Sequence, residues 1–293
     1  MKIGRAIKGS GAVPVLVDEA AGTVTFMTGA LATHANPVLA IIEQGLSAAD
    51  LKKSAGETVP LSSVKFAAPL SAFVRNVLAV GKNYREHAEE FDKSGFNAQA
   101  GTASAIPAYP QLFSKATTTL AGPTDAIRFD PAFTTSVDYE GEIGVVIGKT
   151  CRNVSRADAL AQVFGFVALN DVTARDLQKN HAQWFYGKSL DTFCPLGPWI
   201  ATPDEAPIET LRVQTWVNGE LRQDAPIAQL IFDVPTLIET LSRAMTLLPG
   251  DIIATGTPVG VGIGFTPPKF LKNGDLVRIA VNGLGELNNR VEA

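Results

Sequence analysis

The stretch VDYEGEIGVVIG, residues 137–148, has the alternation of a β-strand that carries several carboxylates on one face. Successive side chains of a strand point to opposite faces, so Glu140 and Glu142 point the same way and Asp138 shares their face. The opposite face is apolar, and the last residues of the stretch are apolar on both sides. Such a strand either meets solvent on one face or holds a cation. Because alternating, half-solvated strands are common, the periodicity alone favours solvent.

A cation held by these glutamates would be a hard metal ion. Their backbone positions lie about 7 Å apart at a rise of ~3.3 Å per residue, so both side chains could reach one ion. Oxygen ligands without thiolate or imidazole suit Mg²⁺, Mn²⁺ or Ca²⁺ better than zinc. Asp171, at the end of the apolar strand in GFVALNDVTARD, could join Glu140 and Glu142 as a third carboxylate.

Other segments carry polar side chains suited to catalysis. His87 and Glu90 are three residues apart on the predicted helix of YREHAEEF, where a glutamate can orient a histidine as a general base. Arg175 and Gln178 follow the apolar strand at short spacing and could grip a carboxylate. Lys188 lies among aromatic and apolar residues in WFYGKSLDTF, an unusual setting for an ammonium without a partner. Taken singly, each also has an ordinary interpretation as a surface residue.

The composition is that of a globular chain without features for binding nucleic acid or membrane. Of 293 residues, 46% are hydrophobic and 18% are charged, and the net charge of −4 provides no basic surplus for a nucleic acid. No run approaches the ~18 apolar residues of a membrane span, and the N-terminal residues lack the apolar core of a secretory signal. We therefore expect a cytoplasmic protein with no nucleic-acid or membrane partner.

Common nucleotide and zinc motifs are missing from the sequence. The GKS at residues 187–189 lacks the glycine that a phosphate-binding loop needs five positions earlier. The Gly-rich segment TGTPVGVGIG lacks the GxGxxG spacing of a dinucleotide site. The histidines His34, His87 and His181 are too scattered along the chain to indicate a zinc cluster, and two cysteines are too few for a disulfide framework.

Turn and capping signals divide the first half of the chain. Alternating runs at the N-terminus predict short antiparallel strands. NPVLAIIEQG predicts a helix capped by Asn36 and ended by Gly45, and the turn-rich stretch after it places a boundary near residue 70. NYREHAEEFDKSG predicts a helix capped by Asn83. Residues 97–136 lack periodicity, which is typical of a lid or binding loop.

The second half is mainly β-structure with a few helices. SRADALAQVF predicts a helix capped by Ser155, and DVPTLIETLSRAM predicts another. RVQTWVNGELRQD predicts a hairpin with Asn218 and Gly219 at its tip. Gly-Asp turns precede two further strands near the C-terminus.

Six blocks occur in an order that resembles the fumarylacetoacetate hydrolase family. They are GKNYREHAEE, DYEGEIGVVIGK, NDVTARDLQ, GKSLDTFCPLGPW, PGDIIATGTPVGVG and LKNGDLVRIAVNGLGEL, and the resemblance runs from about residue 75 to the end of the chain. It implies a β-rich α+β protein, with a mixed β-sandwich roll at residues 71–293 and a small N-terminal α/β domain at residues 1–70. Proteins of this kind are usually homodimers.

The resemblance also implies roles for the polar residues and overrides their surface interpretation. It assigns three roles to nine residues, which are the metal ligands Glu140, Glu142 and Asp171, the catalytic residues His87, Glu90 and Lys188, and the substrate-binding residues Arg175, Gln178 and Thr257. The implied ion is Mg²⁺ or Mn²⁺, with Ca²⁺ in some relatives. The histidine and its glutamate partner lie on a mobile lid in similar proteins.

The implied activity is metal-dependent hydrolysis of a carbon–carbon bond in a 1,3-diketone 2-oxo acid, such as an acylpyruvate, fumarylpyruvate or fumarylacetoacetate. His87, oriented by Glu90, would activate the water, and the metal and Lys188 would stabilise the enolate that leaves. The same scaffold also suits oxaloacetate decarboxylation, hydration or isomerisation of 2-oxo acids, and sugar-acid chemistry. A non-catalytic metal-dependent binding protein is disfavoured by the intact His–Glu pair. The stretch from Asp171 to Lys188 is shorter than in some members of the family, and residues 92–120 differ from the family pattern. The resemblance therefore does not determine which substrate is used.

Overall fold

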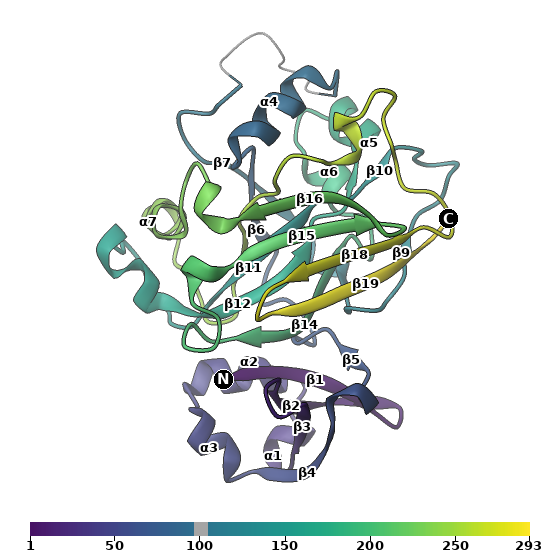
Figure 1. Cartoon of the computed structure of the whole chain (residues 1–293). Helices are drawn as coiled ribbons and strands as arrows, with labels where there is room; N and C mark the ends of the chain where they lie inside the picture. The colour runs from purple at the N-terminus through teal and green to yellow at the C-terminus, as the bar shows by residue number, and fades with distance from the viewer. Residues whose placement is uncertain (97–104) are drawn as a thin grey trace.

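The computed structural model describes residues 1–96 and 105–293, which form a large and a small β-sheet that pack face to face (Figure 1). In spatial order, the strands of the large sheet are β4 (Ala55–Pro60), β3 (Thr23–Met27), β2 (Gly11–Asp18), β1 (Lys2–Lys8), β14 (Cys194–Ala201), β12 (Val163–Asn170), β11 (Gly141–Ile147), β17 (Ile252–Ala254), β6 (Val77–Gly81) and β7 (Gln111–Lys115). Two short strands, β5 (Phe66–Ala67) and β8 (Leu120–Ala121), pair with β1 and β14. The small sheet has the order β16 (Glu220–Pro226), β15 (Arg212–Val217), β18 (Leu276–Val281), β19 (Gly285–Glu292) and β9 (Ile127–Arg128), and a separate ladder joins β10 (Val137–Asp138) to β13 (Thr173–Ala174).

Short helices surround the sheets. The α-helices are α1 (Ala30–Thr33), α2 (Pro37–Gln44), α3 (Ala48–Lys52), α4 (Arg85–Lys93), α5 (Arg175–Asn180), α6 (Phe185–Lys188) and α7 (Val234–Ala244). The 3₁₀ turns are η1 (Leu61–Ser63), η2 (Thr117–Thr119), η3 (Arg156–Gln162), η4 (Ile208–Thr210), η5 (Ile227–Gln229) and η6 (Gly262–Gly264). Helices α4, α5 and α6 gather above the end of the sheets that is remote from the N-terminal strands (Figure 1). None of the helices among the described residues is long and apolar enough to span a membrane.

Strand β11 lies at the centre of the core and is buried along its whole length. On one face, Val145 packs in a cluster with Ile279 and Leu287 of the small sheet. On the other face, Val146 belongs to a cluster that includes Ile42 of α2. The half-solvated strand favoured by the periodicity is therefore wrong, because both faces of β11 are covered. Its carboxylates lie in the interior and need cationic partners there.

The predicted strand over residues 137–148 is interrupted. Residues 139 and 140 belong to neither β10 nor β11. At this point side chains, rather than the carbonyls of a neighbouring strand, accept the backbone N–H groups of Glu140 and Gly141. The Glu140 N–H donates to Asn170 Oδ1 over 3.0 Å, and the Gly141 N–H donates to Gln223 Oε1 over 3.0 Å. The break allows the backbone to leave the ladder next to Glu140 while Glu142 stays within β11.

The N-terminal strands are antiparallel, as the alternating runs predict. Strand β1 also pairs with β14, so these strands extend the large sheet, with α2 and α3 packed beside them (Figure 1). Helix α2 follows Asn36 and ends at Gly45, whose left-handed backbone (φ 61°) suits glycine. Asn36 makes no capping hydrogen bond, because its Oδ1 accepts from the Ser71 N–H instead.

Three other local predictions need correction. Tyr84, not Asn83, precedes α4, because the Asn83 side chain bonds to tertiary partners. The segment after Ser155 is a 3₁₀ turn rather than an α-helix, although Ser155 does accept from the Asp158 N–H as a cap. Of the supposedly irregular residues 97–136, those at 97–104 lie outside the described residues, and the rest contain three short strands and a 3₁₀ turn. The hairpin with Asn218 and Gly219 at its tip is confirmed.

Gly141 provides a test of how tightly the two sheets meet beside the carboxylates. A Cβ at this position would lie 2.2 Å from Thr215 Oγ1 and 3.3 Å from Val213 Cγ2 on the small sheet. We expect Gly141→Ala to lower the free energy of unfolding by about 1–3 kcal/mol, the usual cost of overpacking. Gly11→Ala is the matched control, since its Cβ would meet no atom within 4 Å. Equal urea midpoints for the two variants would contradict this packing.

Candidate metal centre and active site

Three carboxylates meet where β11 and β12 end. Gly141 pairs with Asn170 in the antiparallel register, so Glu140 and Asp171 become neighbours, and the Asp171 N–H donates to the Glu140 carbonyl over 2.9 Å. One oxygen from each of Glu140, Glu142 and Asp171 lies within 4.8 Å of the others. Their exposed fractions are only 4%, 2% and 0%.

The donor set fits a hard divalent cation. Burial, followed by the charges of Asp171 and Glu140, raises the pKa of Glu142 well above its usual range. Although burial alone would raise the pKa of Glu140 as well, Lys188 and Arg175 lower it to about 2. The three carboxylates thus place negative charge close together. Lys188 and Arg175 balance the charge of Glu140, whereas the charge of Glu142 is balanced least. A Mg²⁺, Mn²⁺ or Ca²⁺ ion would remove this repulsion through the ligand type it prefers.

Two buried lysines contact Asp171, one at each of its carboxylate oxygens. Lys188, at the end of α6, places its Nζ 2.7 Å from Glu140 Oε2 and 2.6 Å from Asp171 Oδ2. Lys115, at the end of β7, places its Nζ 2.7 Å from Asp171 Oδ1 and donates to the carbonyls of Val172 and Lys188. Asp171 is therefore held between two ammonium groups, which fixes its carboxylate next to Glu140.

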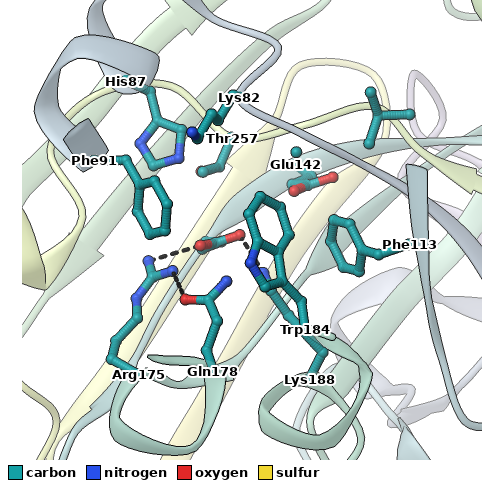
Figure 2. A pocket seen from close by; sticks show the side chains of 13 residues that line it. Lys82, His87, Phe91, Phe113, Glu142, Arg175, Gln178, Trp184, Lys188 and Thr257 are labelled. Atoms are coloured by element: carbon teal, nitrogen blue, oxygen red, sulfur yellow. Dashed lines mark hydrogen bonds and ion pairs between the residues drawn. The ribbon is translucent and has the colours of Figure 1, made fainter. Parts of the chain in front are cut away.

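Arg175, the first residue of α5, contacts and orients the Glu140 carboxylate. Its Nη2 lies 2.6 Å from Glu140 Oε1, and its Nη1 donates to Gln178 Oε1 over 3.1 Å (Figure 2). Its Nε donates to Asp138 Oδ2 over 2.9 Å. Asp138 is buried and also accepts from the Gly262 N–H over 2.7 Å. The guanidinium is thus occupied by protein partners among the described residues. The substrate-binding role implied for Arg175 and Gln178 stays a prediction, although both side chains line the pocket.

His87 faces this pocket from helix α4. Its Nδ1 lies 3.1 Å from Glu90 Oε2, and Glu90 Oε1 accepts from the Gly260 N–H over 3.0 Å. Gly264 allows this close approach, because a Cβ there would lie 1.8 Å from Glu90 Oε1. Figure 2 shows the His87 ring pointing into the cavity that Glu142 and Lys188 also line. The pair therefore has the contacts expected of a base and the group that orients it.

The rings of Phe91, Phe113 and Trp184 line one part of the pocket. The pocket holds about 280 Å³ of empty space, part of which is open to solvent. Trp184 packs edge-on against Phe91, at 5.7 Å between centroids, and against Phe113, at 5.4 Å. Gly81 makes room for the indole, since a Cβ there would lie 2.2 Å from it. Apolar surface of this kind lowers the local dielectric constant and so strengthens electrostatic interactions beside it.

The nine residues assigned from the sequence come together. Seven line the pocket, while Asp171 completes the acidic triad and Glu90 contacts His87. Thr257 donates to the Gly141 carbonyl over 3.0 Å and so ties the segment after β17 to the glutamates. Sequence reasoning missed the lining residues Lys82, Phe91, Phe113 and Trp184 and the buried Lys115.

The family model for the fumarylacetoacetate (FAA) hydrolase C-terminal region matches residues 76–292. The chain belongs to the fumarylacetoacetate hydrolase family. The oxaloacetate tautomerase YisK of Bacillus subtilis (strain 168) is 48% identical over 233 residues, which are 79% of this chain and 74% of YisK. Members of this family act on small molecules. The β-rich fold with mixed sheets expected from the resemblance is confirmed, and the division into two domains near residue 70 stays a prediction.

Two solved structures resemble this chain over its whole length. The fumarylacetoacetate hydrolase of Exiguobacterium antarcticum superimposes with a TM-score of 0.85 at 40% identity and covers 100% of this chain and 99% of that one. The maleylpyruvate hydrolase of Sphingobium sp. SYK-6, described in complex with manganese(II) and pyruvate, gives a TM-score of 0.75 at 30% identity, with 100% and 99% covered. An acidic metal site in this chain agrees with these relationships, and which ion it binds stays a prediction.

We expect Glu142→Ala to weaken Mn²⁺ binding at least about 10–100-fold, the loss typical of removing only an outer-shell partner. Removing a charged oxygen leaves too few ligands to replace the water shell of the ion. Because the variant also relieves like-charge repulsion, the metal-free protein should not unfold more readily than wild type. Equilibrium dialysis and thermal unfolding in chelator measure both effects. Glu57→Ala, an exposed surface control, should change neither, and an unchanged Mn²⁺ affinity in Glu142→Ala would contradict the triad.

Proposed function

We propose that this chain is a divalent-metal-dependent enzyme that forms the enolate of a 2-oxo acid, and that its best-supported reaction is the interconversion of the keto and enol forms of oxaloacetate. The observation that carries the proposal is the placement of a glutamate-held histidine and a buried acidic triad around one small pocket. The 48% identity to an oxaloacetate tautomerase supports this choice of substrate.

In this reaction one proton moves from carbon to oxygen, and several residues of the pocket take part in its transfer. A bound divalent ion would act as a Lewis acid that polarises the 2-oxo group. His87, held by Glu90, takes a proton from the carbon next to that group, and the imidazolium that results gives this proton to the enolate oxygen, which yields the enol and restores the neutral imidazole. Burial alone would lower the pKa of Lys188, but the charges of Asp171 and Glu140 outweigh burial and raise it above its usual value. The side chain therefore stays an ammonium. This ammonium stabilises the negative charge that develops on the enolate.

A second candidate is the hydrolysis of an acylpyruvate, the activity that the sequence implies. In this reaction the His87–Glu90 pair takes a proton from water, and the resulting hydroxide attacks the distal carbonyl. The carbon–carbon bond then breaks, and the electron pair forms the enolate of pyruvate, which is protonated. The solved maleylpyruvate hydrolase, which resembles this chain over its whole length, supports this candidate.

The homodimer and the cytoplasmic location expected from the sequence also stay predictions.

Lys188→Met should lower kcat by about 10²–10³-fold, the range for losing a group that stabilises developing negative charge. Because Met keeps the volume and removes only the ammonium, Mn²⁺ should still bind. Loss of enol absorbance from oxaloacetate gives the rate, and equilibrium dialysis gives the metal affinity. Lys149→Met serves as the exposed-lysine control. A kcat equal to that of wild type would place Lys188 outside the reaction.

His87→Ala should lower both tautomerisation of oxaloacetate and cleavage of acetylpyruvate by about 10²–10⁴-fold, the usual contribution of a positioned base. Decarboxylation of oxaloacetate should fall much less, since it needs an electron sink but no base. Glu90→Gln should give a milder loss of the same pattern, because it keeps the shape and removes the charge. Enol absorbance and pyruvate release, both at saturating Mn²⁺, separate the three reactions.

The wild-type protein decides between the two candidates in the same assays. Rapid enol decay with slow acetylpyruvate cleavage would support the tautomerase, and the reverse would support the hydrolase. Equal losses in all three reactions of His87→Ala would mean that the pair serves binding rather than proton transfer. No turnover of either substrate with Mg²⁺ or Mn²⁺ would overturn the proposal.

A further inference from the structure

Lys82 is a buried cation that lines the pocket and has no task in the reactions above. It follows β6 directly, and only 7% of its surface is exposed. Figure 2 shows its side chain beside His87 and Thr257, on the other side of the cavity from Arg175 and Gln178. A lysine is seldom buried to this extent without a partner for its charge.

The backbone holds Lys82 in an unusual conformation. Its φ of 54° lies in the left-handed region, which residues other than glycine seldom adopt. The next residue, Asn83, is fully buried and anchors this turn, because its Nδ2 donates to the carbonyls of Phe232 and Thr255 while its Oδ1 accepts from the Phe232 N–H. The turn is thus fastened to the body of the protein, and the fold itself directs the Lys82 side chain into the pocket.

The other cations of the pocket are already paired with carboxylates. Lys188 contacts Glu140 and Asp171, and Arg175 contacts Asp138 and Glu140.

Among residues 1–96 and 105–293, the Lys82 ammonium forms a cation–π contact with Phe91, at 5.2 Å from the ring centroid, but no carboxylate lies within ion-pair distance. Burial lowers the pKa of Lys82, and only the more distant charge of Asp92 opposes this. The ammonium therefore lacks the close anionic partner that the buried Lys188 has.

We infer that Lys82 binds the distal carboxylate of a 2-oxo diacid and so makes the enzyme select diacids over monoacids. This inference rests on the proposed function, in which the 2-oxo end of the substrate lies at the acidic triad. His87 is five residues further along the same anchored segment and lines the same cavity. A substrate that spans from the triad to Lys82 would place its middle carbon, the one that loses the proton, beside the imidazole.

Lys82 could instead only support helix α4 by covering the ring of Phe91. The chain offers a matched control for that role in Lys179, whose Nζ lies 5.7 Å from the centroid of Phe96. Lys179 is exposed and does not line the pocket. Methionine at either position keeps the apolar contact with the ring and removes the charge.

The test compares Lys82→Met, Lys82→Arg and Lys179→Met with wild type in the manganese-loaded protein. For oxaloacetate, Lys82→Met should lower kcat/KM by roughly 10–100-fold, mainly through KM, as expected for losing a hydrogen bond to a charged group. For acetylpyruvate, whose tail is neutral, kcat/KM should change less than about threefold. Lys82→Arg should recover most of the loss, and Lys179→Met should match wild type on both substrates.

Binding supplies a second readout that does not depend on turnover. Calorimetry compares 2-oxoglutarate with 2-oxopentanoate, which differ by a carboxylate in place of a methyl group. Wild type should prefer the diacid by roughly tenfold or more, and Lys82→Met should lose that preference. If wild type turns over neither substrate, the proposed function fails, but this loss of preference would still support the role of Lys82. No preference in wild type, an unchanged preference in Lys82→Met, or equal losses on diacid and monoacid would overturn the inference.

Discussion

Negative charge concentrated in the interior is the constraint on which this structure depends. Oxygens of Glu140, Glu142 and Asp171 lie within 4.8 Å of one another at the ends of two strands that are buried on both faces. Charges in such a setting are strongly unfavourable unless they are paired. Nearby cations balance part of this negative charge, as Lys188 and Lys115 do by each contacting one carboxylate oxygen of Asp171. The remaining repulsion, which falls on Glu142, is what a divalent ion would relieve.

The same constraint explains how the pocket is built around the triad. The segments that supply Lys188, Arg175 and His87 are short helices rather than strands, which lets each side chain approach the carboxylates from a different direction. Glycines allow the close approaches, as Gly264 does for Glu90. Aromatic rings such as Trp184 line part of the cavity, and apolar surface of this kind strengthens electrostatic interactions beside it. A single buried site of this kind can serve several reactions of 2-oxo acids, because enolate formation is common to them.

Local patterns in the sequence predicted part of this arrangement. The spacing of His87 and Glu90 along a helix was sufficient to predict their contact, since residues three apart share a helix face. Alternation correctly placed Glu140 and Glu142 together but favoured solvent around them, because it cannot show that distant parts of the chain cover their face of the strand. The approach of Asp171 depends on the register of β11 and β12, which no local pattern contains. That assignment came from the resemblance to the family.

Long-range contacts account for what the sequence did not reveal. Lys115 ends a short strand and looks like a surface residue, yet its ammonium contacts Asp171, which lies 56 residues further along the chain by number. Asn83 resembles a helix cap, but Phe232 and Thr255 compete successfully for its side chain. This competition also positions Lys82, whose left-handed backbone leaves no signal in the sequence. Burial and backbone conformation at these positions are properties of the assembled fold.

Anomalous diffraction from crystals grown with Mn²⁺ tests the central claim most directly. The account predicts one strong peak bonded to an oxygen of each of Glu140, Glu142 and Asp171, and the loss of that peak in Glu142→Ala. A peak at a different set of ligands, or no peak at the triad at saturating Mn²⁺, would contradict it.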